Sequence, residues 1–332
     1  MIEQRPLGRS GRTISAIALG CSNWGRDIDE EASYRLMDYA VERGITLFDT
    51  AESYGGGQSR QKRRDELAVD DEREATDEMS SSERIIGRWL RRTGARDDVT
   101  IETKVGSGGG ADNIARALEG SLERMGIDRV DIYLMHSPDT RTPISETLEA
   151  LTAEVKAGRV GVIGCSNYTA EQLQEALAAS ASGGCERFEI SQPEYNLIKW
   201  RADEELFPIY EQEGLAVAPY NPIGAGFLAG EYTRDLSEIP SGSRFDIIPD
   251  YVDSYFTDPN FRIVDLLREK ADGLGVHVAT LAMAWVMTHP AVTAPIIGAR
   301  TTEHIDGALA AYEMGLDPAL RAEMSAWGRS AE

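Results

Sequence analysis

The strongest constraint on the fold is a regular alternation of short β-rich runs with longer helical patterns along all 332 residues. Such alternation predicts a parallel sheet whose strands are joined by crossover helices. The strand candidates are 17–19, 46–49, 100–104, 130–136, 160–166, 188–192, 216–220 and 294–297. Because each of these eight runs has a matching amphipathic segment, we expect a closed (β/α)8 TIM barrel with outer helices, forming a single domain over residues 1–332.

Three segments depart from this alternation. Residues 5–14 contain Gly8 and Gly11 in a turn-rich setting and predict a short amino-terminal hairpin that closes the bottom of the barrel. Residues 58–82 are highly charged and have no clear period, which predicts a flexible insertion. Residues 237–259 are rich in Pro, Asp, Ser and aromatic residues and predict an ordered excursion. The last two segments follow strands, so both are expected at the carboxyl end of the barrel, where active sites of this fold lie.

Composition narrows the range of partners. The formal net charge of −22 disfavours nucleic acid and anionic membranes, which an acidic surface repels. No long apolar run suggests a membrane span, and the first residues lack the pattern of a secretory signal, so we expect a cytoplasmic protein. Cys21, Cys165 and Cys185 are too widely spaced for a disulfide framework or a metal cluster, and no metal is expected.

Four polar residues follow consecutive predicted strands: Asp49, Tyr54, Lys104 and His136. A phenol with a pKa of about 10 is a poor acid, but a neighbouring ammonium stabilises its phenolate and lowers that pKa. Tyr54 beside Lys104 is therefore predicted to donate a proton. Asp49 is expected to keep Lys104 charged, and His136 to orient a substrate oxygen. Each residue alone has a structural explanation, but their joint appearance after strands two, three and four indicates chemistry.

The sequence resembles the aldo-keto reductase superfamily over nearly its whole length. The matching stretches are FDTAESYGGG, ETKVG, LMHSPD, GRVGVIGCSNYTAEQL, SQPEYNL, APYNPIGAGFLAGEY and PIIGARTTEHI. The resemblance implies that Asp49, Tyr54, Lys104 and His136 are the catalytic residues. It also implies an NAD(P)H-dependent oxidoreductase that interconverts an aldehyde or ketone and its alcohol, with hydride from the nicotinamide and a proton from Tyr54.

The resemblance further implies a nicotinamide cofactor site. Ser166, Asn167 and Gln192 are expected to bind the carboxamide, and Tyr220 to stack on the ring; a helix cap is an alternative role for Ser166 and Asn167. The remaining cofactor contacts implied are Pro222, Ile223, Gly224, Gly226 and Leu228 around the pyrophosphate, and Gly298, Arg300, Thr301, Thr302 and His304 at the adenosine end. Trp24 is expected to line the substrate pocket.

Some positions depart from the family pattern. The family commonly has Gln at the position of His304, and an acidic residue followed by Asn at Gly307 and Ala308. These residues usually grip the adenine and the 2′-phosphate. Arg300 favours NADP(H), while NAD(H) stays open. The insertion at 58–82 follows the predicted acid, so it is either a lid that gates the substrate or a tolerated disordered insertion.

Two other functions remain open. One is a nucleotide-binding sensor or auxiliary subunit with little turnover, like the channel-associated members of the superfamily. The other is an NAD-dependent sugar or polyol dehydrogenase. The predicted partner is a small carbonyl or alcohol, and Ser22 and Asn23 hint at a sugar. Oligomeric state is not readable from the sequence.

Overall fold

The computed structural model describes residues 2–69 and 72–329 and contains a sheet of eight parallel strands. Thr293 N and Ala294 N donate to Val217 O, and Ile296 N donates to Pro219 O, so the two ends of the sheet meet and close the barrel. The predicted (β/α)8 fold is thus confirmed. In order around the barrel the strands are β10 (Ile296–Gly298), β3 (Ala18–Gly20), β4 (Leu47–Asp49), β5 (Thr100–Val105), β6 (Val130–Met135), β7 (Val160–Ser166), β8 (Phe188–Gln192) and β9 (Ala216–Val217).

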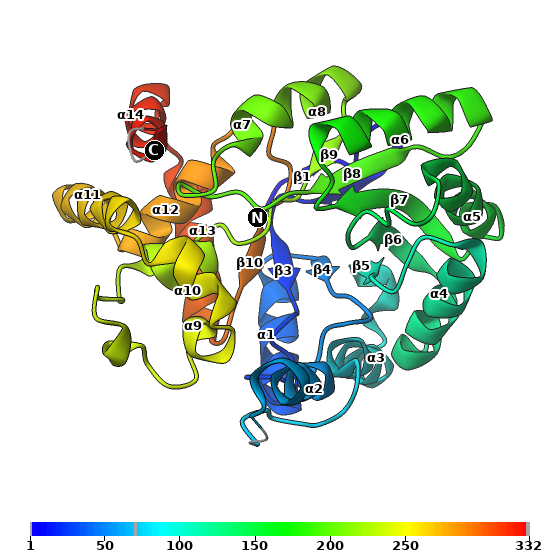
Figure 1. The fold of residues 1–332 in the computed structure, drawn as a ribbon, viewed down its shortest axis with the longest axis horizontal. Helices are drawn as coiled ribbons and strands as arrows, with labels where there is room; N and C mark the ends of the chain where they lie inside the picture. The colour runs from blue at the N-terminus through cyan, green and yellow to red at the C-terminus, as the bar shows by residue number, and fades with distance from the viewer. Residues whose placement is uncertain (1, 70–71, 330–332) are drawn as a thin grey trace.

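Helices surround the strands on the outside of the barrel (Figure 1). Their packing follows from apolar stripes: in α3, Ile85, Ile86, Trp89 and Leu90 are buried on one face. Gly87 lets α3 approach α4, because a Cβ there would lie 2.5 Å from Met125 O. The outer elements are α1 (Glu30–Glu42), α3 (Ser81–Thr93), η1 (Ala95–Asp98), α4 (Ala111–Met125), α5 (Ile144–Lys156), α6 (Ala170–Gly183), α7 (Ala202–Glu205), α8 (Phe207–Glu213), α11 (Asp258–Leu274), α12 (Val278–Met287), α13 (Thr302–Met314) and α14 (Pro318–Arg329).

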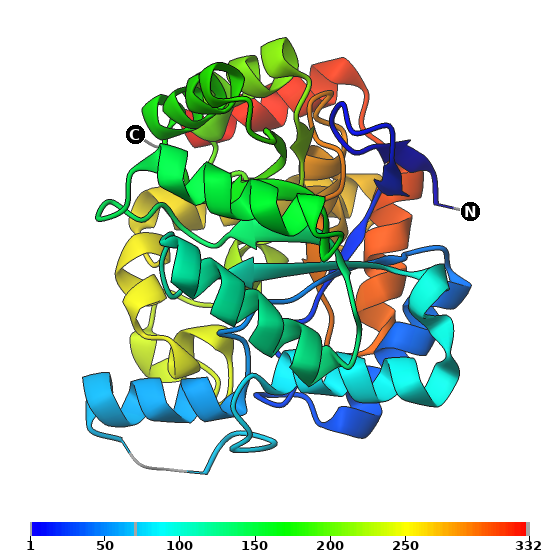
Figure 2. The same cartoon turned by 90° about the vertical axis from the view of Figure 1, so that its right-hand side faces the viewer.

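The amino-terminal hairpin consists of the antiparallel strands β1 (Gln4–Pro6) and β2 (Thr13–Ser15). Leu7 and Ile14 are buried in the same apolar cluster as side chains from β3, β4, β6, β7 and β8. Arg5 Nη1 donates to Val292 O and Thr293 O, both at 3.1 Å, just before β10 begins. The hairpin therefore closes the amino end of the barrel, as predicted, and lies opposite the 237–259 excursion (dark blue and yellow in Figure 2).

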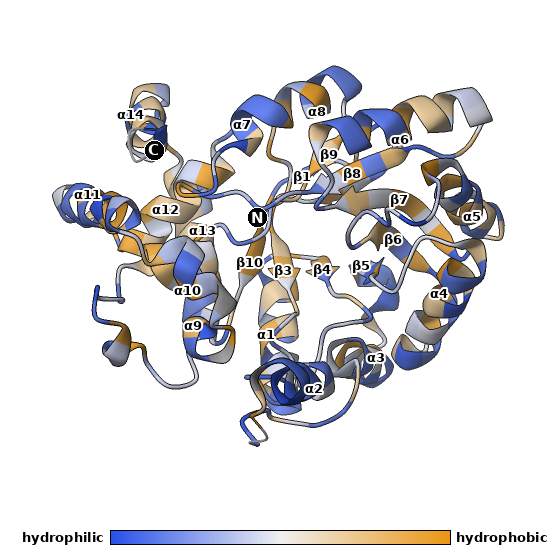
Figure 3. Ribbon diagram, viewed as in Figure 1, coloured by the Kyte–Doolittle hydropathy of each residue, from blue (hydrophilic) through white to orange (hydrophobic). Residues whose placement is uncertain are grey.

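The insertion after Tyr54 contains a helix, α2 (Gly56–Leu67). The sequence analysis predicted a flexible insertion and no helix here, because the sequence of α2, GGQSRQKRRDEL, has no apolar face (Figure 3). The returning chain is held to the loop after β3, because Ala75 N donates to Arg26 O and Thr76 N to Gly25 O. Whether this segment acts as a lid stays a prediction.

The second excursion is ordered, as expected. After the turn η2 (Gly224–Ala229) it contains η3 (Leu236–Glu238), α9 (Arg244–Ile247) and α10 (Asp250–Tyr255). Phe227, Tyr232, Phe245 and Phe256 contact one another with ring centroids 4.9–6.4 Å apart. These aromatic contacts hold the excursion together against the barrel.

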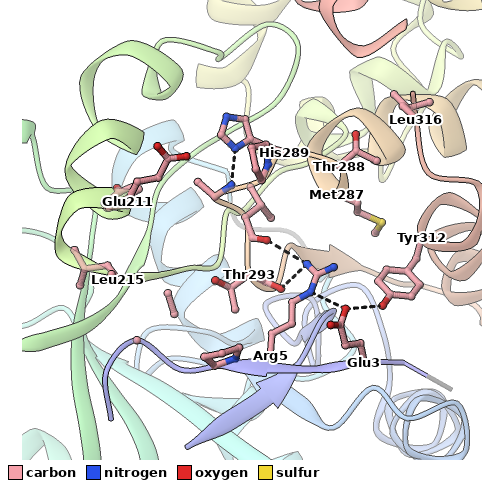
Figure 4. Close-up of a pocket in the computed structure, with 18 of the residues that line it drawn as sticks. Glu3, Arg5, Glu211, Leu215, Met287, Thr288, His289, Thr293, Tyr312 and Leu316 are labelled. Carbon is pink, nitrogen blue, oxygen red and sulfur yellow. Dashed lines mark hydrogen bonds and ion pairs between the residues drawn. The ribbon is translucent and has the colours of Figure 1, made fainter. Parts of the chain in front are cut away.

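Two cavities lie at opposite ends of the barrel. The larger, about 1080 Å³, lies at the amino end between the hairpin, α8, the 287–293 loop and α13 (Figure 4). The smaller, about 580 Å³, opens beside His136 at the carboxyl end. Within the described ranges, no helix combines the length and apolar character needed to cross a membrane.

Candidate active site

The structure brings Asp49, Tyr54 and Lys104 into direct contact. The Lys104 ammonium is fully buried inside the barrel, and its Nζ donates to Asp49 Oδ1 at 2.5 Å, Thr50 O at 2.8 Å and Tyr54 Oη at 3.3 Å. An ammonium has three donors, so these three acceptors satisfy it completely. The strand ends explain the meeting, because β4 and β5 are neighbours and both end at the same edge of the barrel.

The charge of Lys104 is stable in this setting. Burial alone would lower the pKa of Lys104, but the nearby Asp49, together with Tyr54 and Glu102, raises it above its ordinary value. The predicted effect on Tyr54 needs correction. Burial and the Asp49 charge outweigh the lowering by Lys104, so the net pKa of Tyr54 is raised rather than lowered. Tyr54 is therefore protonated at neutral pH and Lys104 is positioned to stabilise its phenolate.

His136 joins this group from the end of β6. Its ring meets the ring of Tyr54 edge to face with centroids 5.5 Å apart, and its Nδ1 lies 3.4 Å from Ser53 Oγ. Burial, reinforced by the Lys104 charge, lowers the pKa of His136 to about 4. The imidazole is therefore neutral at pH 7, which suits a hydrogen-bonding role better than a charged one.

A fifth polar residue, Glu102, was missed by the sequence analysis. Its side chain is fully buried in the barrel, and Gln192 Nε2 donates both to Glu102 Oε1 at 2.7 Å and to Asp49 Oδ1 at 3.0 Å. Burial first, and then the Asp49 charge, raises the pKa of Glu102 well above its ordinary value, so the protonated form of the carboxyl is favoured. The spacing could have revealed it, since residues 102 and 104 of one strand face the same side.

The residues expected around the nicotinamide also lie together. Asn167 has φ of +60°; its Nδ2 donates to His136 O at 2.9 Å and to Ser166 Oγ at 3.1 Å, and Tyr220 Oη donates to Asn167 Oδ1 at 2.8 Å. The helix-cap alternative is wrong, because Thr169 caps α6. Gln192 lies deeper, with its amide nitrogen engaged inside the barrel.

The segment from Pro222 to Leu228, with Ile223 between, turns sharply beside Tyr220. Gly224 and Gly226 have φ of +56° and +97°, and a Cβ on Gly224 would lie 2.8 Å from the Tyr255 ring. Arg244, which the sequence analysis missed, packs on the Tyr251 ring at 5.7 Å. Within the described residues no carboxylate lies within 4 Å of its guanidinium, and its charge reaches Tyr54. The guanidinium is held by Tyr251 and also interacts with the Asp27 charge, so it has partners without being in a close ion pair.

The predicted adenosine end contains Gly298, Thr301 and Thr302 next to an engaged cation. Arg300 Nη2 donates to Asp27 Oδ2 at 2.9 Å and to Gly242 O at 3.3 Å, so it already has an acidic partner. His304 caps its own helix, because its Nδ1 accepts from Thr301 N at 3.2 Å. Arg300 and His304 therefore both have contacts within the protein. Their roles in binding the adenosine end of the cofactor stay predictions.

The expectation for Trp24 needs correction. The ring is fully buried, packs edge-on against Phe48 with centroids 6.4 Å apart, and lines neither cavity. The loop after β3 turns it into the core because Gly25 N pairs with Ile28 O and the insertion covers the loop. Trp24 is a core residue in this structure.

Comparison with known proteins identifies the family of the chain. The sequence matches the Aldo/keto reductase family over residues 16–327. It is 33% identical to the uncharacterized oxidoreductase YrpG of Bacillus subtilis (strain 168), over 95% of this chain and 93% of that protein. It is 30% identical to a probable voltage-gated potassium channel subunit beta of Oryza sativa subsp. japonica (92% and 89%) and 29% identical to L-glyceraldehyde 3-phosphate reductase of Escherichia coli (strain K12) (92% and 86%). The chain belongs to the aldo/keto reductase family of oxidoreductases.

Proposed function

We propose that this protein is an NAD(P)H-dependent reductase of aldehydes or ketones in which Tyr54 is the proton donor. The observation that carries the proposal is the contact between Lys104 Nζ and Tyr54 Oη, 3.3 Å apart, with Asp49 holding the ammonium from the other side. A protonated phenol beside a permanent cation is suited to give up its proton when negative charge develops on a nearby oxygen.

In the proposed reaction the substrate carbonyl oxygen lies between Tyr54 Oη and His136. A nicotinamide bound beside Tyr220 and Asn167 would supply the hydride for the carbonyl carbon. As the oxygen gains charge, the Tyr54 O–H bond breaks and its proton passes to that oxygen, leaving a phenolate beside Lys104. Since Nδ1 of His136 faces Ser53, its Nε2 is the nitrogen available to orient the carbonyl.

The residues at the mouth suit the cofactor. Tyr220 offers an aromatic face, and the hydroxyl and amide of Ser166 and Asn167 suit a carboxamide. The tight turn at Gly224 and Gly226 allows close approach of a pyrophosphate, and Arg244 beside Tyr251 adds positive charge in the adjoining excursion. Arg300 together with Arg244 favours NADP(H) over NAD(H). We place the enzyme in the cytoplasm, acting on small molecules and not on nucleic acid.

Replacing Tyr54 with Phe tests this function. We expect kcat to fall by about 1000-fold or more, because general acid catalysis contributes about 100- to 10,000-fold. The dissociation constant of NADPH, measured by quenching of intrinsic fluorescence, should change by less than about three-fold. A Tyr54→Phe enzyme with near-normal turnover would remove Tyr54 from the mechanism.

The similarity to a probable potassium channel subunit beta supports a second candidate, a nucleotide-binding auxiliary subunit. Tight NADPH binding without turnover across aliphatic, aromatic and sugar aldehydes would favour that function. Tighter binding of NADH than of NADPH, with faster alcohol oxidation than reduction, would instead favour an NAD-dependent sugar or polyol dehydrogenase.

A further inference from the structure

The cavity beside His136 has an unusual lining. Small-molecule sites are mostly lined by apolar and aromatic side chains, whereas every residue that lines this cavity of about 580 Å³ is polar or a glycine. The lining includes Glu52, Ser53, Ser107, His136, Ser137 and Asn167. These residues come from the loops after β4, β5, β6 and β7, the strands that also carry the candidate catalytic residues. The cavity thus borders one of the candidate catalytic residues, His136, and lies next to the loop that carries Tyr54.

Glu52 is held in place by one oxygen of its carboxylate. Its Oε1 accepts from Gly106 N at 2.7 Å and from Ser107 N at 2.9 Å, and its backbone O accepts from Ser80 Oγ at 2.6 Å. No hydrogen bond reaches its Oε2 from the described part of the chain. One carboxylate oxygen therefore fixes the side chain and the other remains available to accept from a ligand.

The charges of the wall distinguish between possible ligands. Arg124 is the one permanent cation among the lining residues, and it is committed to the buried Glu83, with Nε donating to Oε2 at 2.6 Å. Because His136 is neutral at pH 7, the wall offers an available carboxylate without an available cation. A phosphorylated or carboxylated ligand would be repelled by Glu52, whereas hydroxyl groups would find an acceptor in Glu52 and mixed donors and acceptors in Ser53, Ser107 and Ser137.

We propose that this cavity binds the hydroxylated tail of the substrate, so that the enzyme acts on uncharged polyhydroxylated aldehydes or ketones, the open-chain forms of simple sugars. The substrate carbonyl lies at Tyr54 and His136, and Glu52 Oε2 accepts a hydrogen bond from a hydroxyl further along the chain. This inference rests on the proposed reductase function. It adds the substrate class and a specificity-determining residue, Glu52.

The test compares glyceraldehyde with propanal, which has the same carbon skeleton and no hydroxyls. With rates corrected for the unhydrated aldehyde fraction, we expect kcat/KM for glyceraldehyde to exceed that for propanal by about ten-fold or more. In Glu52→Gln the amide oxygen can still accept from Gly106 and Ser107, but the other position becomes a donor. We expect a loss of about ten-fold or more in kcat/KM for glyceraldehyde, mostly through KM, since hydrogen bonds to charged groups contribute about 1.5–3 kcal/mol.

Propanal kinetics of Glu52→Gln should stay within about two-fold of wild type, which also shows that the variant folds. Glu119→Gln, the same exchange at an exposed position of α4, is the matched control and should change neither substrate. Equal kcat/KM for the two aldehydes would overturn this inference while leaving the reductase function standing, and so would a ten-fold preference for glyceraldehyde 3-phosphate over glyceraldehyde. No reduction of any aldehyde, aromatic ones included, would overturn both.

Discussion

The two ends of this barrel carry cavities of opposite character. At the amino end, two of the polar side chains that line the larger cavity have internal partners: Arg5 bonds Val292 O and Thr293 O, and His289 Nε2 lies 3.2 Å from Asp203 Oδ1. At the carboxyl end, the smaller cavity has an available carboxylate oxygen on Glu52 and borders a neutral His136. Cavity size alone would select the amino end. The buried cluster of Asp49, Glu102 and Lys104 beside the smaller cavity, with its shifted pKa values, selects the carboxyl end.

The interior of the barrel shows the same division. Its amino-terminal half is filled by aliphatic side chains such as Leu47, Ile132 and Ile190, together with Leu7 and Ile14 from the hairpin. Its carboxyl-terminal half holds Asp49, Glu102, Lys104 and Gln192, all buried. The aliphatic layer excludes water below the polar layer, which strengthens the electrostatic interactions within it.

Replacing Lys104 should have the largest effect on turnover, and it is the strongest test of the difference between the two ends of the barrel. In Lys104→Met we expect kcat to fall by about 1000-fold or more, because no charge remains to stabilise the Tyr54 phenolate. The free energy of unfolding should also drop by about 3–5 kcal/mol, since Asp49 is left buried without its partner. Single-turnover rates and denaturant unfolding measure the two effects.

Arg5→Met is the matched change at the amino end. It removes a cation that bonds two carbonyls, so some stability should be lost, but kcat should stay within about two-fold. If Lys104→Met retained a tenth of wild-type turnover, or Arg5→Met lost as much as Lys104→Met, the division between the two ends would be incorrect.

Replacing Glu102 with Gln should have an intermediate effect, a change in the free energy of unfolding that depends on pH. The unfolded carboxyl ionises near pH 4.3, whereas the folded one, with its raised pKa, keeps its proton. Above that pH the folded wild type binds one more proton than the unfolded chain, so its stability falls as pH rises, by up to about 1.4 kcal/mol per unit. Glu102→Gln removes this dependence. As the pH rises from 5 to the pKa of Glu102 in the folded protein, the unfolding free energy of Glu102→Gln should therefore increase relative to that of the wild type.

Unfolding by urea at several pH values measures that difference. Glu102→Ala serves as the comparison, because it also stops titrating but leaves a cavity and takes one acceptor from Gln192. It should be less stable than Glu102→Gln at every pH. A stability difference between Glu102→Gln and wild type that did not change with pH would mean that Glu102 is ionised in the folded protein.

The smallest effect is expected for Glu211→Gln, which repeats the Glu52→Gln exchange in the wall of the amino-end cavity. Glu211 is exposed, so the unfolding free energy should change by less than about 0.5 kcal/mol, and kcat/KM for glyceraldehyde by less than two-fold. A Glu211→Gln enzyme with altered substrate preference would show that the larger cavity communicates with the reaction centre.

The sequence predicted those features that depend on local periodicity. Strand ends were readable, and so was the meeting of Asp49, Tyr54 and Lys104, because neighbouring parallel strands end at one edge. Features that depend on tertiary packing could not be predicted from the sequence. Trp24 follows a strand toward the mouth, yet only the packing of the loop shows that its ring turns into the core.

The sign of the Tyr54 pKa shift illustrates the same limit. The neighbouring ammonium was predictable, but the amount of burial and the opposing Asp49 charge decide the net direction, and neither can be read from spacing. Arg244 lies in an excursion without periodicity, so its approach to Tyr54 had no sequence signal. Glu102 did have one, since it precedes Lys104 by two residues on the same strand.

The ion pair between Arg300 and Asp27 affects how a nucleotide would bind to this protein. Asp27 occupies the guanidinium in the way that a phosphate oxygen would, and the same guanidinium holds Gly242 O of the excursion. In the proposed cofactor complex, a phosphate that binds Arg300 would share the guanidinium with this internal anion, because Asp27 and Gly242 engage only its Nη2 among the described residues. Nucleotide binding would then add a third partner to a side chain that already joins the loop after β3 to the excursion.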